Sequence, residues 1–194
     1  RVRETVRNRT MTTTNLMSTY NRMDVTFVRG DGAELWDQNG RRYLDALSGI
    51  AVTGLGHAHP AVTEALCLQA GTLVHTSNLY RIEHQEALGA SLSALSGLSH
   101  AFFCNSGAEA NEAALKLARR YGNERGEHNA TVIVAEGSFH GRTMATLSAT
   151  GNPKVHAGFE PLLSGFVHVP YGDLAAVAQE FATNKSVVAV FVEP

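Results

Sequence analysis

A short polar stretch between two predicted elements could bind an anion. Asn105-Ser106-Gly107-Ala108 follows an apolar stretch predicted to be a strand over residues 101–104, and it opens a helix predicted from Gly107 to Tyr121. Small side chains leave the first backbone N–H groups of such a helix accessible, and these donors together with the helix dipole favour a phosphate or a carboxylate. Asn105 or Ser106 could instead simply cap the helix. This stretch alone leaves both interpretations open.

A second polar loop should lie at the same edge of the sheet. Gly137-Ser138-Phe139-His140-Gly141-Arg142-Thr143 follows a strand predicted over Thr131–Ala135, and the carboxyl ends of parallel strands gather at one edge. In this loop Phe139 could stack on a flat ring, and Arg142 could hold a carboxylate through two hydrogen bonds. A core phenylalanine and a surface arginine are the alternatives. We therefore expect a ligand site at this edge, with Phe139 and Arg142 as candidates.

Other chemistries lack their motifs. Neither the P-loop pattern GxxxxGK[ST] nor the dinucleotide pattern GxGxxG occurs in the chain. Ser138 stands in the order Gly-Ser-Phe-His-Gly, which is out of register for a GxSxG hydrolase elbow. His57 and His59 are two residues apart, but no third ligand at a recognisable spacing and no CxxC pair accompany them. We therefore predict no metal site.

The rest of the pattern predicts the elements that would position these residues. Short apolar segments alternating with turn signals, among them Asn39-Gly40, predict a small antiparallel sheet over residues 25–47. Helices are predicted at Pro60–Leu73, Glu83–Leu95 and Asp173–Ala182, and further strands at Gly165–Val169 and Val187–Val192. Strands that alternate with helices indicate an α/β fold. We expect a mostly parallel sheet with flanking helices, preceded by a small antiparallel β segment.

Two predictions concern burial. The helix from Gly107 is predicted to pack on the sheet through the apolar face formed by Ala110, Ala114, Leu117, Ala118 and Tyr121. Cys67 and Cys104 lie in apolar runs, so we expect buried free thiols and a reducing compartment.

Composition and charge limit the classes of binding partner. The 194 residues include 16 Lys and Arg and 18 Asp and Glu, for a formal charge of −2, which indicates neither a nucleic-acid partner nor a membrane surface. The longest apolar stretches fall short of the roughly 18 residues that a membrane span needs. We expect a cytoplasmic protein, although the arginine-rich first ten residues could be either a remnant of an organellar targeting peptide or a frayed tail.

The chain is expected to comprise three segments. Residues 1–24 would form a tail with a short helical segment, residues 25–55 the small antiparallel β segment, and residues 56–194 the first part of a larger domain. The final predicted strand stops where its loop begins, so we expect the chain to be a piece of a longer protein.

Several motifs together resemble a known family. Asn105–Arg119, Phe139–Thr143, Pro170–Asp173 and Val192–Pro194 are similar to the class III aminotransferases, which use pyridoxal 5'-phosphate (PLP). The resemblance runs from about residue 20 to the end of the chain. Within the family, the motifs most similar to those of acetylornithine aminotransferases are Gly49–Val52, Gly56–Pro60 and His75–Tyr80. The resemblance implies the PLP-dependent transferase fold of type I, here incomplete.

The resemblance implies a role for each residue that would contact the cofactor. Ser106, Gly107 and Ala108 would donate backbone and hydroxyl hydrogen bonds to the PLP phosphate. Phe139 would stack on the pyridine ring, and His140 would lie beside it as a further cofactor-binding residue.

The resemblance also implies substrate contacts. Arg142 would bind the α-carboxylate of the amino-acid substrate. Asn78 and Tyr80 would lie near the substrate entrance and partly face the other subunit, because the family's sites form at a homodimer interface. Glu193 precedes a loop that shapes the site. Ile50 stands where ornithine aminotransferases carry a tyrosine, which favours an N-acylated substrate.

The family's catalytic lysine and the aspartate that pairs with the pyridine nitrogen would lie beyond residue 194, and Lys116, Lys154 and Lys185 match no motif for that lysine. This part alone would then contain no catalytic residue and would be inactive. The implied reaction is transfer of an amino group from N2-acetylornithine to 2-oxoglutarate in arginine metabolism. Succinylornithine, ornithine, 4-aminobutyrate or a lysine-type substrate are alternatives, as is an inactive regulatory module that binds PLP or another anion.

Overall fold

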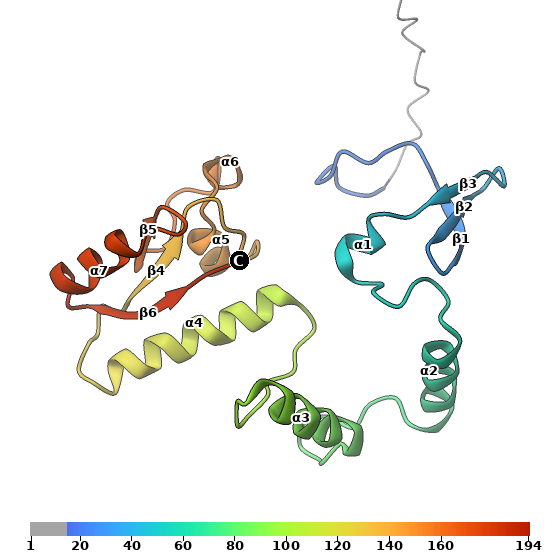
Figure 1. Cartoon of the computed structure of the whole chain (residues 1–194), viewed down its shortest axis with the longest axis horizontal. Coiled ribbons are helices and arrows are strands. Elements are labelled where there is room, and N and C mark those ends of the chain that lie inside the picture. Colours follow the sequence, from blue (N-terminus) through green and yellow to red (C-terminus); the bar gives the residue numbers. More distant parts are fainter. Residues whose placement is uncertain (1–14) are drawn as a thin grey trace, which may run out of the picture. The chain divides into compact units, whose positions relative to one another are not determined.

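In the computed structural model, residues 15–194 are described, and the chain divides into two compact units, residues 1–80 and 81–194. The first unit holds an antiparallel sheet of order β1-β2-β3 (Figure 1), formed by β1 (Phe27–Asp31), β2 (Glu34–Asp37) and β3 (Arg42–Leu44). The predicted antiparallel segment is confirmed. The Asp37 carboxylate accepts N–H groups from Asn39 and Arg41, each at 2.9 Å, which fixes the turn between β2 and β3.

A left-handed turn, α1 (Ser48–Ala51), follows β3. Its φ angles are +50° at Ser48, +61° at Gly49, +62° at Ile50 and +60° at Ala51. The left-handed region costs a residue other than glycine about 1–2 kcal/mol, and it is least suited to a β-branched side chain. No local pattern in the sequence predicted this turn. Helix α2 (Pro60–Thr72) begins at Pro60, as predicted.

The second unit is an α/β structure (Figure 1). Helices α3 (Glu83–Ser96) and α4 (Gly107–Asn123) precede a parallel sheet of order β5-β4-β6. Its strands are β4 (Thr131–Ala135), β5 (Phe166–Val169) and β6 (Val187–Phe191), and α7 (Leu174–Thr183) connects the last two. The prediction of a mostly parallel sheet with flanking helices, preceded by a small antiparallel segment, is confirmed.

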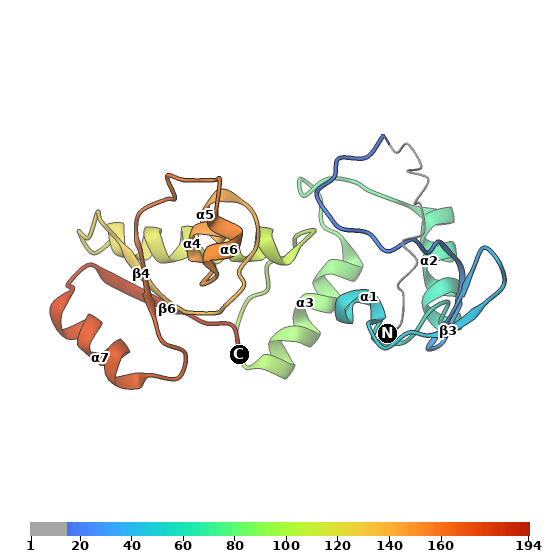
Figure 2. The same ribbon diagram turned by 90° about the horizontal axis from the view of Figure 1, so that it is seen from above.

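Strand β4 is the centre of this unit because all five of its residues are buried. Val132 and Val134 pack with Leu115 of α4 and with Ala149 of the short helix α5 (Met144–Ala149). Figure 2 shows α7 on the opposite face of the sheet from α4 and α5. On the α7 face, Ile133 lines an apolar cavity of about 320 Å³.

Two short helices after β4 were not predicted. In α5, Thr143 and Thr146 form a reciprocal capping box, although Thr146 stands where the sequence signature of this motif has Glu or Gln. Helix α6 (Pro153–His156) is capped by Asn152, whose side chain accepts the N–H of Lys154. Both helices lie in the connection from β4 to β5.

Two predictions about the segment before α4 are wrong. Residues 101–104 form no strand, because among the described residues no neighbouring strand pairs with them. Without a sheet around it this segment is largely open, and Cys104 is exposed rather than buried. Cys67 is also exposed, since α2 buries none of its residues within the described chain.

The predicted packing face of α4 is wrong in part: Ala118 packs against the core, but Ala110, Leu117 and Tyr121 are exposed. Leu117 and Tyr121 are 68% and 48% exposed, whereas Leu115 and Gly122 are buried. The face toward the sheet is built from Ala108, Asn111, Glu112, Leu115, Ala118 and Gly122. This face contains small and polar residues because the loop of residues 137–143 lies close to it and forms hydrogen bonds with it. The periodicity of apolar residues therefore does not identify the buried face of this helix.

At the amino terminus, residues 15–24 contain no helix, and residues 1–14 lie outside the described residues. The predicted short helical segment could lie only in that outer part and stays a prediction, as do the boundaries at 24/25 and 55/56. Of the helices in residues 15–194, none combines the length and the apolar character needed to cross a membrane.

Candidate active site

The start of α4 is capped by its own side chains. Ser106 Oγ accepts the backbone N–H of Glu109 at 3.2 Å, and the Ser106 hydroxyl donates to the Glu109 carboxylate at 3.1 Å. The same carboxylate accepts the backbone N–H of Asn105 at 2.9 Å. Hydrogen bonds from the side chains of Asn105 and then Ser106 lower the pKa of Glu109. The capping interpretation is therefore correct for Ser106.

The cap leaves two of the expected donors open. Within residues 15–194, no hydrogen bond uses the backbone N–H groups of Gly107 and Ala108. A Cβ added at Gly107 would meet no atom within 4 Å, so the space in front of this turn is free. Hence the helix start still offers two amides and a positive dipole end to an anion.

The loop of residues 137–143 lies directly against the first turns of α4. The Asn111 side-chain N–H donates to the carbonyl of His140 at 2.8 Å. Gly141, with φ +132°, has no room for a side chain, because a Cβ there would lie 2.5 Å from Thr146 Oγ1 and 3.0 Å from Ala108 Cβ. The Thr143 hydroxyl donates to Glu112. The expectation that the two polar stretches meet at one edge of the sheet is confirmed.

His140 is fixed in this loop but keeps one nitrogen open. The residue is buried, its backbone N–H donates to Thr150 Oγ1 at 2.9 Å, and its ring stacks on Phe191 with 4.5 Å between centroids. Burial lowers the pKa of His140, which favours the neutral imidazole. Its Nε2 is buried and has no hydrogen-bond partner among the described residues. A buried polar atom of this kind calls for a partner.

Phe139 and Arg142 extend from the same loop. The Phe139 ring is 49% exposed and so is not a core residue, and its backbone N–H donates to Glu193 Oε2 at 2.7 Å. Glu193 follows β6, so the end of that strand fixes the loop after β4. Arg142 is exposed. The loop thus exposes an aromatic ring and a guanidinium group at one sheet edge and holds a buried imidazole nitrogen beneath them.

The remaining predicted residues belong to the other unit. Ile50 and Tyr80 are 80% and 69% exposed, and Asn78 is exposed as well. Their participation in the site stays a prediction.

Sequence reasoning missed the residues that hold the loop. Asn111, Thr150 and Phe191 each contact His140 through a different group. Asn111 stands among Glu109, Ala110 and Glu112, so its residue type alone did not distinguish it. Thr150 and Phe191 are distant in sequence, and no local pattern marks them.

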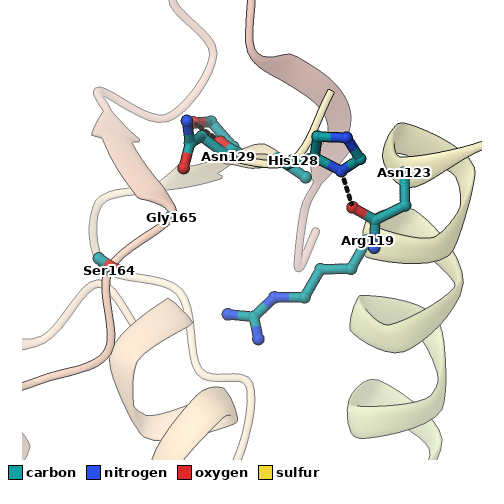
Figure 3. A pocket seen from close by; sticks show the side chains of 8 residues that line it. Arg119, Asn123, His128, Asn129, Ser164 and Gly165 are labelled. Atoms are coloured by element: carbon teal, nitrogen blue, oxygen red, sulfur yellow. Dashed lines mark hydrogen bonds between the residues drawn. The ribbon is translucent and has the colours of Figure 1, made fainter. Parts of the chain in front are cut away.

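A second cavity lies away from these residues (Figure 3). It measures about 550 Å³ and opens at the amino ends of β4 and β5, between Thr131 and Gly165. Figure 3 shows the Arg119 side chain reaching from α4 toward the Ser164–Gly165 segment. None of the predicted site residues lines this cavity, which lies at the opposite end of the strands from residues 137–143.

Comparison with known proteins agrees with this geometry. Residues 16–194 match the family model of the class III aminotransferases. An acetylornithine aminotransferase of Nitrosomonas europaea is 63% identical over 179 residues, which cover 92% of this chain and 46% of that protein.

Two solved structures are also similar. An ornithine aminotransferase from Toxoplasma gondii, described with PLP at partial occupancy in its active site, has a TM-score of 0.83 at 34% identity and covers 90% of this chain and 42% of that one. An N-acetylornithine aminotransferase from Stenotrophomonas maltophilia has a TM-score of 0.71 at 36% identity, with coverage of 90% and 43%.

The chain spans less than half the length of these three relatives. The match nevertheless includes every described residue from 16 onward, and the motifs at Asn105–Arg119 and Phe139–Thr143 meet at one edge of the fold. The resemblance found in the sequence is confirmed, and the chain belongs to the class III aminotransferase family.

Proposed function

We propose that this chain is the amino-terminal part of a PLP-dependent aminotransferase that transfers the δ-amino group of N2-acetylornithine to 2-oxoglutarate in arginine metabolism. One observation carries the proposal: the open amides of Gly107 and Ala108 adjoin a loop that presents a half-exposed Phe139 and an unpartnered His140 nitrogen. The acetylornithine aminotransferase of N. europaea, at 63% identity, supports the substrate.

The residues present fit the cofactor. Gly107 and Ala108 would donate to the phosphate, and the Ser106 hydroxyl could join them by turning away from Glu109, which is an exposed contact. Phe139 would cover one face of the pyridine ring. His140, held neutral by burial, could accept or donate one hydrogen bond through Nε2. When bound, PLP supplies an electron-withdrawing ring that stabilises negative charge at the substrate carbon.

The chain's own residues would then bind and orient the substrate. Arg142 would hold the α-carboxylate in a bidentate pair, which fixes the direction of the substrate chain. Ile50 would exclude a free α-amino group and so favour an N-acylated one, with Asn78 and Tyr80 near the entrance. Glu193 would act mainly by fixing the backbone of Phe139.

We further propose a cytoplasmic homodimer, with Asn78 and Tyr80 partly facing the partner's site. The lysine that binds PLP would be supplied by the rest of the protein, since none of Lys116, Lys154 and Lys185 stands in a motif that matches the family's lysine.

The complete protein tests the reaction. Incubation with PLP should give a visible absorbance band, and borohydride should then fix the cofactor to one lysine outside residues 1–194. A protein that shows neither would contradict the enzyme assignment. If the isolated chain were monodisperse and bound PLP without a covalent link while the complete protein had no activity, it would be an inactive binding module.

A substrate panel tests the specificity. N2-acetylornithine should give a higher kcat/KM than succinylornithine, ornithine or 4-aminobutyrate, with 2-oxoglutarate as acceptor in every assay. A higher kcat/KM for any of the other three substrates would be consistent with a transaminase but would contradict N2-acetylornithine as its substrate.

A further inference from the structure

The left-handed turn α1 presents its apolar side chains outward. Leu47, Ile50 and Val52 are 66%, 80% and 80% exposed, so within the described residues no apolar packing holds the turn in its conformation. Left-handed backbone at residues other than glycine persists only where the surroundings fix it. Within the described residues the turn is therefore stabilised by polar contacts, among them its own backbone hydrogen bonds from Ile50 N–H to the Leu47 carbonyl and from Val52 N–H to the Ser48 carbonyl, each at 2.9 Å.

Asp45 adds a side-chain contact at the start of the turn. Its Oδ1 accepts the backbone N–H groups of Leu47 and Ser48, each at 2.9 Å, directly where the turn begins. The side chain is only 8% exposed, so its oxygens depend on protein donors. One carboxylate oxygen thus fixes the direction in which the chain enters the turn.

His57 fixes the other oxygen. Its Nε2–H donates to Asp45 Oδ2 at 2.6 Å, and the ring is 23% exposed. The His57 hydrogen bond is the main cause of the lowered pKa of Asp45, which keeps that carboxylate ionised and able to accept all three donors. The pair is therefore a charged anchor for the turn.

The anchor is itself attached to the antiparallel sheet. The backbone of His57 exchanges two hydrogen bonds with Gly32, at 2.8 and 3.0 Å. Gly30 admits no side chain here, because an added Cβ would lie 2.7 Å from His57 Cβ and Cγ. The backbone N–H of Asp45 donates to Ala33 at 2.8 Å. A continuous path of close contacts thus connects the β1–β2 turn to residues 47–51.

We infer that the Asp45–His57 pair is a positioning device for Ile50, and that through the turn it sets the discrimination between N-acylated and free diamino-acid substrates. The inference rests on the substrate role proposed for Ile50. Its own basis is that, among residues 15–194, the contacts that hold this left-handed, outward-facing turn are hydrogen bonds, and that the side-chain ones come from Asp45. Asp45 and His57 act through the backbone and need not touch the substrate.

The test compares two substrates in the complete protein. His57→Ala should lower kcat/KM for N2-acetylornithine roughly 10- to 100-fold, because a small displacement of a substrate-contacting group is costly. It should also shift the ratio of kcat/KM values for N2-acetylornithine and ornithine in the same direction as Ile50→Ala. The double variant should show little further shift, since both changes act on one contact.

Two variants separate positioning from simple loss of folding. His57→Gln places an amide N–H where it can still donate to Asp45, so it should restore most of the wild-type ratio. Asp31→Ala is the matched control: Asp31 is an exposed acid of the same unit, 3.8 Å from Arg29, and its removal should leave both kcat/KM values unchanged.

Different outcomes overturn different statements. If His57→Ala lowers kcat/KM for N2-acetylornithine and for ornithine by the same factor, the ratio of the two values is unchanged. The Asp45–His57 pair then has only a structural role, and the inference is wrong. If Ile50→Ala leaves the ratio unchanged, the substrate role of Ile50 fails and the inference fails with it. A wild-type protein without transaminase activity would instead overturn the proposed function. If the His57→Ala protein does not fold, Asp45→Asn is the variant to use. Amide hydrogen exchange at Leu47 and Ser48 is measured together with the ratio of kcat/KM values for the two substrates. If neither changes, the inference is wrong.

Discussion

Two segments that carry proposed site residues are stabilised in different ways. The turn α1 is held by its own backbone hydrogen bonds and by the Asp45 carboxylate, which His57 fixes, and its apolar side chains are exposed. The loop of residues 137–143 follows a fully buried strand and is tied to α4, α5 and the end of β6. Changes near the turn should therefore alter substrate handling first. Changes beneath the loop should reduce the stability of the whole unit.

The largest effect is expected at Gly151. A Cβ there would lie 2.2 Å from the carbonyl oxygen of Ala135 and 2.7 Å from the nitrogen of Gly137. Because both neighbours are backbone atoms, Gly151→Ala should destabilise the unit by about 3 kcal/mol or more. Thermal unfolding of the complete protein measures this.

Gly107→Ala is the control for that measurement, since an added methyl group meets nothing within 4 Å. Its melting temperature should stay close to wild type. Equal losses in the two variants would mean that the loop does not depend on close packing against β4.

The next effect is expected at Gly30, in the other unit. Gly30→Ala should push His57 away and cost about 1–3 kcal/mol locally, the usual range for overpacking. Since the turn rests on polar contacts, hydrogen exchange should rise at Leu47 and Ser48 and substrate discrimination should fall. If Gly30→Ala mainly caused cooperative unfolding of residues 81–194, the turn α1 and the loop of residues 137–143 would not differ in the way described above.

A smaller effect is expected at Glu193. Glu193→Ala removes the acceptor of the Phe139 N–H, so PLP affinity should fall by about 1 kcal/mol, or roughly fivefold. Fluorescence titration of the apo form with PLP measures it. Glu64→Ala, at an exposed position on α2, is the matched control. Unchanged affinity in the Glu193 variant would show that the strand end does not position the ring.

The smallest effect is the pH dependence of His140. Burial places its folded pKa below the unfolded value of about 6.5, so the unfolded chain binds more protons and stability falls as the pH drops below that value. His140→Phe keeps a ring against Phe191 and cannot titrate, so its melting temperature should fall less between pH 7.5 and 5.5, about one pH step either side of 6.5. The same slope in both proteins would contradict this.

Much of the fold was predictable because local rules and tertiary packing agree there. Pro60 begins α2, the alternation after residue 130 gave the parallel strands, and Ser106 with Gly107 marked the start of α4. The loop of residues 137–143 was located for the same reason, since it follows β4 at the carboxyl edge of the parallel sheet, whereas the strand predicted before α4 does not form.

The sequence by itself indicated that the start of α4 meets the loop of residues 137–143, and it indicated the family to which the chain belongs. Tertiary structure alone decided which face of α4 is buried, that residues 101–104 form no strand, and that Ile50 lies in a left-handed turn. The physical reason is that these outcomes depend on partners far along the chain. Asn111 lies on the face toward the loop of residues 137–143 because its side chain donates to the carbonyl of His140, and Asp45 can hold the start of the turn because His57 fixes it. Neither contact leaves a local pattern in the sequence.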